Sequence, residues 1–133
     1  IYTGEDTLSL HDALPISTHW AQSRAWMHPP LATTTLMAAH NEQVTRMPEG
    51  AECLGGSDFC PIGSMQIGQH IWTTQYHPEM PLVFMQALLG YLGDKLDADT
   101  IARAHTSLAS AADVPLFGQW MVQFLEHARE NNT

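Results

Sequence analysis

The apolar pattern of this chain changes at Pro81, and that change limits the folds that the chain can adopt. Before Pro81, apolar residues form short runs bounded by glycine and proline, which is typical of strands. After Pro81, they recur at helical spacing, and a proline suits the first turn of a helix. Strands are expected at 33–39, 44–47, 51–55, 64–67 and 71–76, with a hairpin turn at 68–70.

Three helices are expected after Pro81. Asp97 or Asp99 can cap the second helix, and Asp113 opens the third. Strands followed by helices in a chain of 133 residues predict a single α/β domain. The third helix is expected to turn one apolar face inward, made of Phe117, Met121, Phe124 and Leu125.

Charge and composition exclude several functions. The net charge is −9 and the five basic residues are scattered, so binding to a nucleic-acid backbone is disfavoured. No apolar run reaches the roughly 18 residues of a membrane span, so no membrane association and a cytoplasmic location are expected. Cys53 and Cys60 are expected to be free thiols. No metal and no cofactor are predicted. Core packing is expected for the four tryptophans, Trp20, Trp26, Trp72 and Trp120.

The first 17 residues are expected to be foreign to the protein. Residues 6–16, DTLSLHDALPI, are what a common sequencing adapter encodes when it is translated in frame, and residues 1–3 fit the adapter segment upstream of its index. The alternative is a genuine N-terminal segment with leucines at positions 8, 10 and 14. The favoured interpretation divides the chain into a translated artefact, 1–17, and a native part, 18–133.

A histidine, a proline and a glutamate follow the last expected strand. Ligands of α/β sheets bind outside the carboxyl ends of strands, so His77 lies where a site is expected. Pro78 fixes its own φ and favours an extended His77. A cysteine nucleophile needs a base, and that base needs a group that fixes its tautomer, so His77 and Glu79 can act as base and orienter. Spacing alone favours a purely structural pair.

Four stretches together resemble class I glutamine amidotransferases in order and spacing. The likeness is strongest over 26–92 and is closest to stand-alone members similar to the amidotransferase part of GMP synthase. It implies that 18–133 is the C-terminal portion of a flavodoxin-like, three-layer α/β domain with a helical tail. The stretches are 39–51 (AHNEQVTRMPEGA), 57–61 (SDFCP), 65–68 (MQIG) and 75–80 (QYHPEM).

The resemblance also implies roles for individual residues. The family's catalytic histidine and glutamate fall on His77 and Glu79. The substrate-loop candidates are His40, Gln75 and Tyr76, although the segment that carries His40 has a glutamate where the family usually has an aspartate.

No nucleophile is expected within the chain. The family's cysteine lies in a Gly-x-Cys-x-Gly pattern, which surrounds neither Cys53 nor Cys60. The resemblance therefore implies an intact parent that hydrolyses glutamine to glutamate and ammonia through a cysteine thioester, while this chain alone is expected to be inactive. Glutamine or another γ-glutamyl substrate is the expected ligand, and an ammonia-accepting synthase is an expected partner. Two alternatives stay open: a γ-glutamyl peptidase-type hydrolase, and a non-catalytic binding or regulatory module of the same fold.

Overall fold

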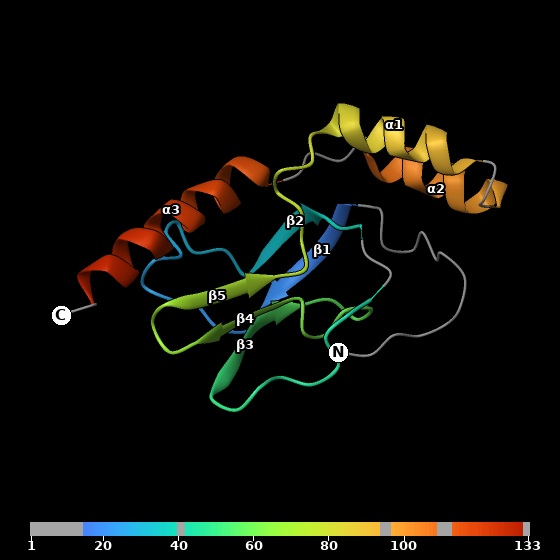
Figure 1. Ribbon diagram of the computed structural model, residues 1–133. Helices are drawn as coiled ribbons and strands as arrows, with labels where there is room; N and C mark the ends of the chain where they lie inside the picture. The colour runs from blue at the N-terminus through green and yellow to red at the C-terminus, as the bar shows by residue number, and fades with distance from the viewer. Residues whose placement is uncertain (1–14, 40–41, 94–96, 109–112, 132–133) are drawn as a thin grey trace.

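The structure is a computed structural model that describes residues 15–39, 42–93, 97–108 and 113–131. Five strands come first and three helices follow (Figure 1). The order confirms the α/β class and the strands-then-helices arrangement predicted from the sequence. The elements are β1 (Pro15–Trp20), β2 (Thr33–Met37), β3 (Ala51–Gly56), β4 (Ser64–Ile67), β5 (Ile71–Thr74), α1 (Leu82–Leu92), α2 (Ala98–Leu108) and α3 (Val114–Glu130).

The five strands form one sheet in the order β2-β1-β3-β4-β5. Every strand pairing among the described residues is antiparallel. Strands β4 and β5 form the predicted hairpin, in which Ile67 pairs with Ile71. Gly68 opens the turn with a φ of 55°, a left-handed conformation that glycine adopts without steric cost.

The sheet curls so that the end of its edge strand β2 meets the segment that follows its other edge strand, β5 (Figure 1). Ala38, just after β2, forms an isolated antiparallel bridge with Tyr76, just after β5. The backbone N–H of His77 donates to the carbonyl oxygen of Met37 at 2.8 Å. These bonds cover part of the outer edge of β2, which would otherwise expose unpaired backbone groups.

The start of α3 covers the next part of the same edge. The backbone N–H of Asp113 donates to the carbonyl oxygen of Thr35 at 2.8 Å. The N–H of Thr35 donates in return to Oδ2 of Asp113, also at 2.8 Å. Asp113 is the N-cap residue of α3, as predicted, but its side chain makes no hydrogen bond to the helix. Its carboxylate is used to attach the helix to the sheet.

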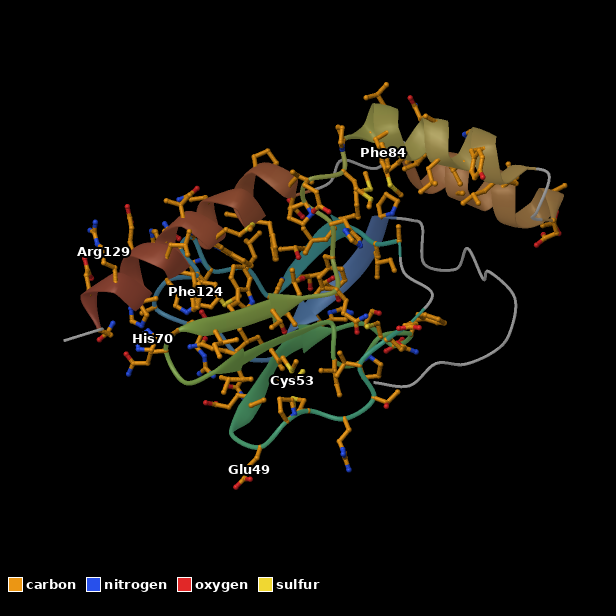
Figure 2. All side chains as sticks on the ribbon, viewed as in Figure 1. Glu49, Cys53, His70, Phe84, Phe124 and Arg129 are labelled. Atoms are coloured by element: carbon orange, nitrogen blue, oxygen red, sulfur yellow. The ribbon has the colours of Figure 1, made fainter. Side chains whose placement is uncertain are left out.

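An aromatic cluster fills the space between α3 and one face of the sheet (Figure 2). The rings of Trp20 and Trp120 meet edge to face with centroids 5.2 Å apart, and those of Trp26 and Trp72 lie 4.5 Å apart. Indole N–H groups need partners when buried: Nε1 of Trp20 donates to Thr34 Oγ1 at 2.9 Å, and Nε1 of Trp120 donates to the carbonyl oxygen of Pro29 at 3.1 Å. The core role predicted for the tryptophans is confirmed.

A smaller apolar cluster joins α1 and α2 to the end of β2. It consists of Met37, Met85, Leu89, Leu92, Ala104 and Leu108. Phe84, on the other side of α1, is exposed (Figure 2). No described helix combines the length and apolar character needed to cross a membrane.

Two sequence predictions of local structure are wrong. The segment 44–47 is an extended loop and not a strand, because the backbone N–H of Val44 bonds to the side chain of Gln75 instead of a neighbouring strand. On α3, Met121 and Leu125 are 42% and 67% exposed, and Trp120 takes the predicted inward place beside Phe117 and Phe124.

Strand β1 begins inside the segment 1–17. Pro15 pairs with Met37 and Ile16 with Leu36, and Ile16 packs against the aromatic core. Strand pairing uses backbone groups that every residue except proline possesses in full. The pairing therefore does not distinguish a native segment from a translated adapter. The division at residue 17 therefore stays a prediction, and residues 1–14 lie outside the described part of the chain.

Candidate active site

His77 and Glu79 are joined by a hydrogen bond directly after β5. Nδ1 of His77 lies 2.7 Å from Oε1 of Glu79. The side chain of His77 is 31% exposed and that of Glu79 is 66% exposed. A turn closes the segment, since the N–H of Met80 donates to the carbonyl oxygen of His77 at 3.2 Å. The pair is therefore ordered by local geometry and open to solvent on one side.

The contact determines which ring nitrogen of His77 holds the proton. An ionised carboxylate can only accept, so Nδ1 donates to Glu79 and the neutral imidazole keeps its lone pair on Nε2. The same hydrogen bond lowers the pKa of Glu79, and slight burial opposes that shift only in part. Glu79 is thus ionised at neutral pH, in the state that an orienter requires.

The sheet fixes the backbone position of His77. Its N–H is bound to Met37 on β2, while the preceding Tyr76 bridges to Ala38. The histidine consequently sits where the two ends of the curled sheet meet. The sequence pattern indicates His77 at a strand end but carries no signal for its contact with Met37, because the two residues are forty positions apart.

Gln75 carries the largest set of polar contacts near the pair. Its Oε1 accepts from the backbone N–H of Val44 at 2.8 Å, and its Nε2 donates to the carbonyl oxygen of Glu42 at 3.0 Å. The Sγ of Cys60 lies 3.4 Å from the same Oε1. Gln75 therefore joins the loop after β2 to the strand end that carries His77.

Tyr76 points into the core. It is 3% exposed and belongs to the aromatic cluster. Burial raises the pKa of Tyr76 to about 12, and the Thr18 hydroxyl offsets part of that rise. Yet no hydrogen bond of good geometry joins the two hydroxyls within the described residues. Tyr76 was a substrate-loop candidate in the sequence; the structure brings its backbone to the site and its ring to the interior.

Neither of the two cysteines forms a disulfide within the described structure. Cys60 is fully buried, its thiol lies against Gln75, and its backbone N–H donates to Ser57 Oγ at 3.0 Å. Cys53, on β3, directs its thiol to the carbonyl oxygen of Pro61 at 3.5 Å (Figure 2). His40 lies outside the described residues, so its place relative to the pair is not part of this geometry.

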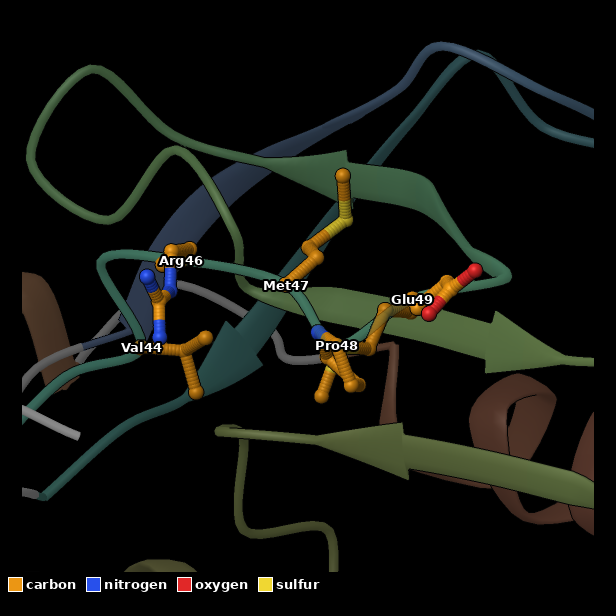
Figure 3. A pocket seen from close by; sticks show the side chains of 6 residues that line it. Val44, Arg46, Met47, Pro48 and Glu49 are labelled. Carbon is orange, nitrogen blue, oxygen red and sulfur yellow. The ribbon is translucent and has the colours of Figure 1, made fainter.

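A pocket of about 560 Å³ opens beside the Val44 loop (Figure 3). Apolar side chains dominate its lining, and Arg46 and Glu49 add one charge of each sign at different ends. No pattern in the sequence indicates this pocket, since Met65 comes to it from β4. Nowhere in the described ranges do three metal-binding side chains gather. The lining residues are Val44, Arg46, Met47, Pro48, Glu49 and Met65.

Comparison with known proteins gives partial matches. No family model matches the chain. A segment of 48 residues, 35% of this chain, is 35% identical to the GMP synthase [glutamine-hydrolyzing] of Porphyromonas gingivalis and covers 10% of that protein. Another 48-residue match, 36% of this chain, is 33% identical to gamma-glutamyl peptidase 3 of Arabidopsis thaliana and covers 19% of it.

Two solved structures share the fold. The crystal structure of SMU.1228c superimposes with a TM-score of 0.61 at 16% identity, covering 89% of this chain and 52% of that one. A Thermoplasma acidophilum protein described as a GMP synthase subunit gives a TM-score of 0.50 at 12% identity, covering 92% of this chain and 50% of that one. The chain thus spans about half of these structures and a small part of the curated relatives.

Fold and site together define an α/β protein that holds a carboxylate-oriented histidine at the end of a strand. Over about a third of its length, the chain is similar in sequence to glutamine-hydrolysing GMP synthases and to a gamma-glutamyl peptidase. Most of the chain shares its fold with the two solved structures.

Proposed function

We propose that this chain supplies the base and its orienter to a glutamine amidotransferase. The observation that carries the proposal is the 2.7 Å hydrogen bond between His77 Nδ1 and Glu79 Oε1, which leaves Nε2 as the free basic nitrogen. The matched GMP synthase is glutamine-hydrolysing by name, which supports the same chemistry here. In this proposal the acceptor of the ammonia is a synthase partner.

The pair suits both halves of a cysteine-dependent amide hydrolysis. Nε2 of His77 takes the proton of a cysteine thiol as its sulfur attacks the side-chain carbonyl of glutamine, and Glu79 stabilises the imidazolium that forms. The imidazolium then protonates the leaving nitrogen, so that ammonia departs and a γ-glutamyl thioester remains. Water attacks the thioester, His77 accepts its proton, and the thiol regains a proton as glutamate leaves.

The attacking thiol is not assigned to Cys53 or Cys60. Cys60 is buried against Gln75, and Cys53 directs its thiol to the backbone carbonyl oxygen of Pro61, in the loop after β3. A nucleophile must instead be exposed beside its base, on a sharp turn near oxyanion donors. The proposal therefore places the nucleophile on a segment outside this chain and expects the chain alone to be inactive.

A γ-glutamyl peptidase is the second candidate. Its support is the match to gamma-glutamyl peptidase 3. The aligned segment covers 19% of that protein, compared with 10% of the GMP synthase. The same His77–Glu79 chemistry serves this reaction, with an amine of a peptide as the leaving group in place of ammonia.

Reconstitution tests the proposal. The purified chain is mixed with a separately expressed part of the matched Porphyromonas gingivalis GMP synthase that is to supply the nucleophile, and glutamate release is measured with glutamine and with γ-glutamyl peptides. We expect no release by the chain alone, release by the mixture, and loss of it with His77→Ala. His70→Ala is the matched control, because His70 is exposed at the tip of the β4–β5 hairpin (Figure 2).

Two results would contradict the proposal. Release of glutamate by the chain alone, abolished by His77→Ala, would show that the nucleophile lies within the chain. If the two parts form a complex that releases no glutamate, His77 is not the base. The preferred substrate separates the two candidate functions.

A further inference from the structure

Gln75 binds the loop 42–44 through its side chain, and Gln43 within that loop also forms an isolated backbone β-bridge. Its carboxamide accepts from the N–H of Val44 and donates to the carbonyl oxygen of Glu42, at 2.8 and 3.0 Å. A neighbouring parallel strand makes the same two kinds of bond to the residues that flank its partner. The carboxamide of Gln75 therefore imitates one peptide unit of a strand paired with the loop.

The contact has the properties of a built feature. Gln75 is partly buried, both polar ends of its carboxamide are used, and Cys60 packs its thiol against Oε1 from the opposite loop. Its own backbone N–H donates to the carbonyl oxygen of Gly63 at 2.8 Å, so the residue that holds the loop is itself anchored to the sheet. A carboxamide can donate and accept at once in a fixed geometry.

We propose that Gln75 is a positioning residue that sets the loop 42–44, and with it one wall of the Val44 pocket, at a fixed place relative to His77. Val44 is both a partner of Gln75 and a lining residue of the pocket. Gln75 and His77 are two residues apart, about 7 Å along an extended chain. One short segment thus carries the base and determines where the neighbouring wall stands.

The functional part of this inference rests on the proposed function. If substrate lies between His77 and the loop, release of the loop weakens substrate binding without changing the His77–Glu79 bond. Gln75 acts through the loop and is not expected to touch the reacting atoms. Its loss should therefore raise KM more than it lowers kcat.

Two substitutions separate the two bonds. Gln75→Leu removes both, whereas Gln75→Glu keeps the acceptor for Val44 and can donate to Glu42 only when its carboxyl group is protonated. The matched control is Gln69→Leu, at an exposed position in the β4–β5 turn. Amide hydrogen exchange of Val44 measures the first bond, and the backbone carbonyl chemical shift of Glu42 measures the second.

We expect Gln75→Leu to accelerate exchange of the Val44 amide about tenfold, in line with loss of one net hydrogen bond, while amides of β4 keep their protection. Gln75→Glu should retain the protection of the Val44 amide. The carbonyl chemical shift of Glu42 should return to its wild-type value as the pH falls through the pKa of the new carboxyl group. A general structural defect would not reverse with pH. In the reconstituted enzyme, Gln75→Leu should raise KM about tenfold or more.

The outcomes are distinguishable. Unchanged Val44 exchange in Gln75→Leu, or no pH-dependent recovery in Gln75→Glu, would overturn the assignment of Gln75 as the residue that holds the loop. Faster exchange with unchanged KM would overturn its positioning role. A reconstituted wild type that lacks activity would contradict the proposed function instead, while the exchange and shift measurements still decide whether Gln75 holds the loop.

Discussion

Gly63 leaves the space that Tyr76 fills, and a methyl group there should destabilise the protein measurably. A Cβ built on Gly63 would overlap the hydroxyl oxygen of Tyr76 and lie 2.7 Å from Cζ of the same ring. The backbone of Gly63 does not have a left-handed φ, so the expected cost of Gly63→Ala is steric and not conformational. Neither side can move freely, because the carbonyl oxygen of Gly63 accepts from Gln75 and Tyr76 is packed in the core.

The magnitude follows from that overlap. Forcing one extra carbon into a packed core costs about 1–3 kcal/mol. For a chain of this size, that corresponds to a fall in Tm of roughly 4 °C per kcal/mol. Tyr76→Phe removes the atom that the new methyl group meets first, and the hydroxyl has no hydrogen-bond partner of good geometry among the described residues. The double variant should therefore recover on the order of 1 kcal/mol, measured as a coupling energy.

Urea unfolding monitored by tryptophan fluorescence provides the assay, because the aromatic cluster lies beside Tyr76. Gly90→Ala is the matched control: a Cβ at this position meets nothing within 4 Å, and alanine in the interior of α1 should stabilise by up to about 1 kcal/mol. An unfolding midpoint of Gly63→Ala equal to that of wild type would refute the steric argument. Recovery absent from the double variant would show that the hydroxyl is not the obstacle.

Two further results are expected. Because His77 holds the pKa of Glu79 below its ordinary value, His77→Ala should raise that pKa, which carboxyl ¹³C NMR measures, and an unmoved pKa would contradict this cause. The small stabilisation from the pair should be present above the ordinary glutamate range and lost as the pH falls through the folded-state pKa of Glu79. Asp113→Ala should lower the free energy of unfolding by about 1–2 kcal/mol and accelerate hydrogen exchange of the Thr35 amide, because that donor at the edge of β2 loses its partner. Asp113→Asn keeps an acceptor and should cost less, so equal effects of the two variants would argue against the hydrogen bond.

Local patterns predicted most of the elements, since they depend on residues close in sequence. Short runs bounded by glycine and proline located β2, β3, β4 and β5, and helical spacing located α1 to α3. The errors have physical causes. At 44–47 a side chain took the place of a strand, and on α3 the large indole of Trp120 occupied the inward face in place of the slimmer Met121.

The candidate site was predictable to a similar extent. His77 and Glu79 are two residues apart, so a short segment suffices to suggest their contact. The contacts of Met37 with His77, and of Gln75 with Val44, join segments far apart in sequence. No pattern within either segment indicates its partner, and the pocket escaped prediction for the same reason.

The junction at the outer edge of β2 has a consequence for the order in which the molecule folds. The hydrogen bond of Thr35 needs Asp113, which is 78 residues away in the sequence, and that of Met37 needs His77. Contacts of such long range form after the loop entropy between their partners has been lost, so they belong to the slow part of folding. The β4–β5 hairpin can form early, but His77 reaches its final backbone position only when the first and last parts of the sheet have come together. His77 and the aromatic core that joins Trp20 to Trp120 should therefore take their final places in the same late phase of folding.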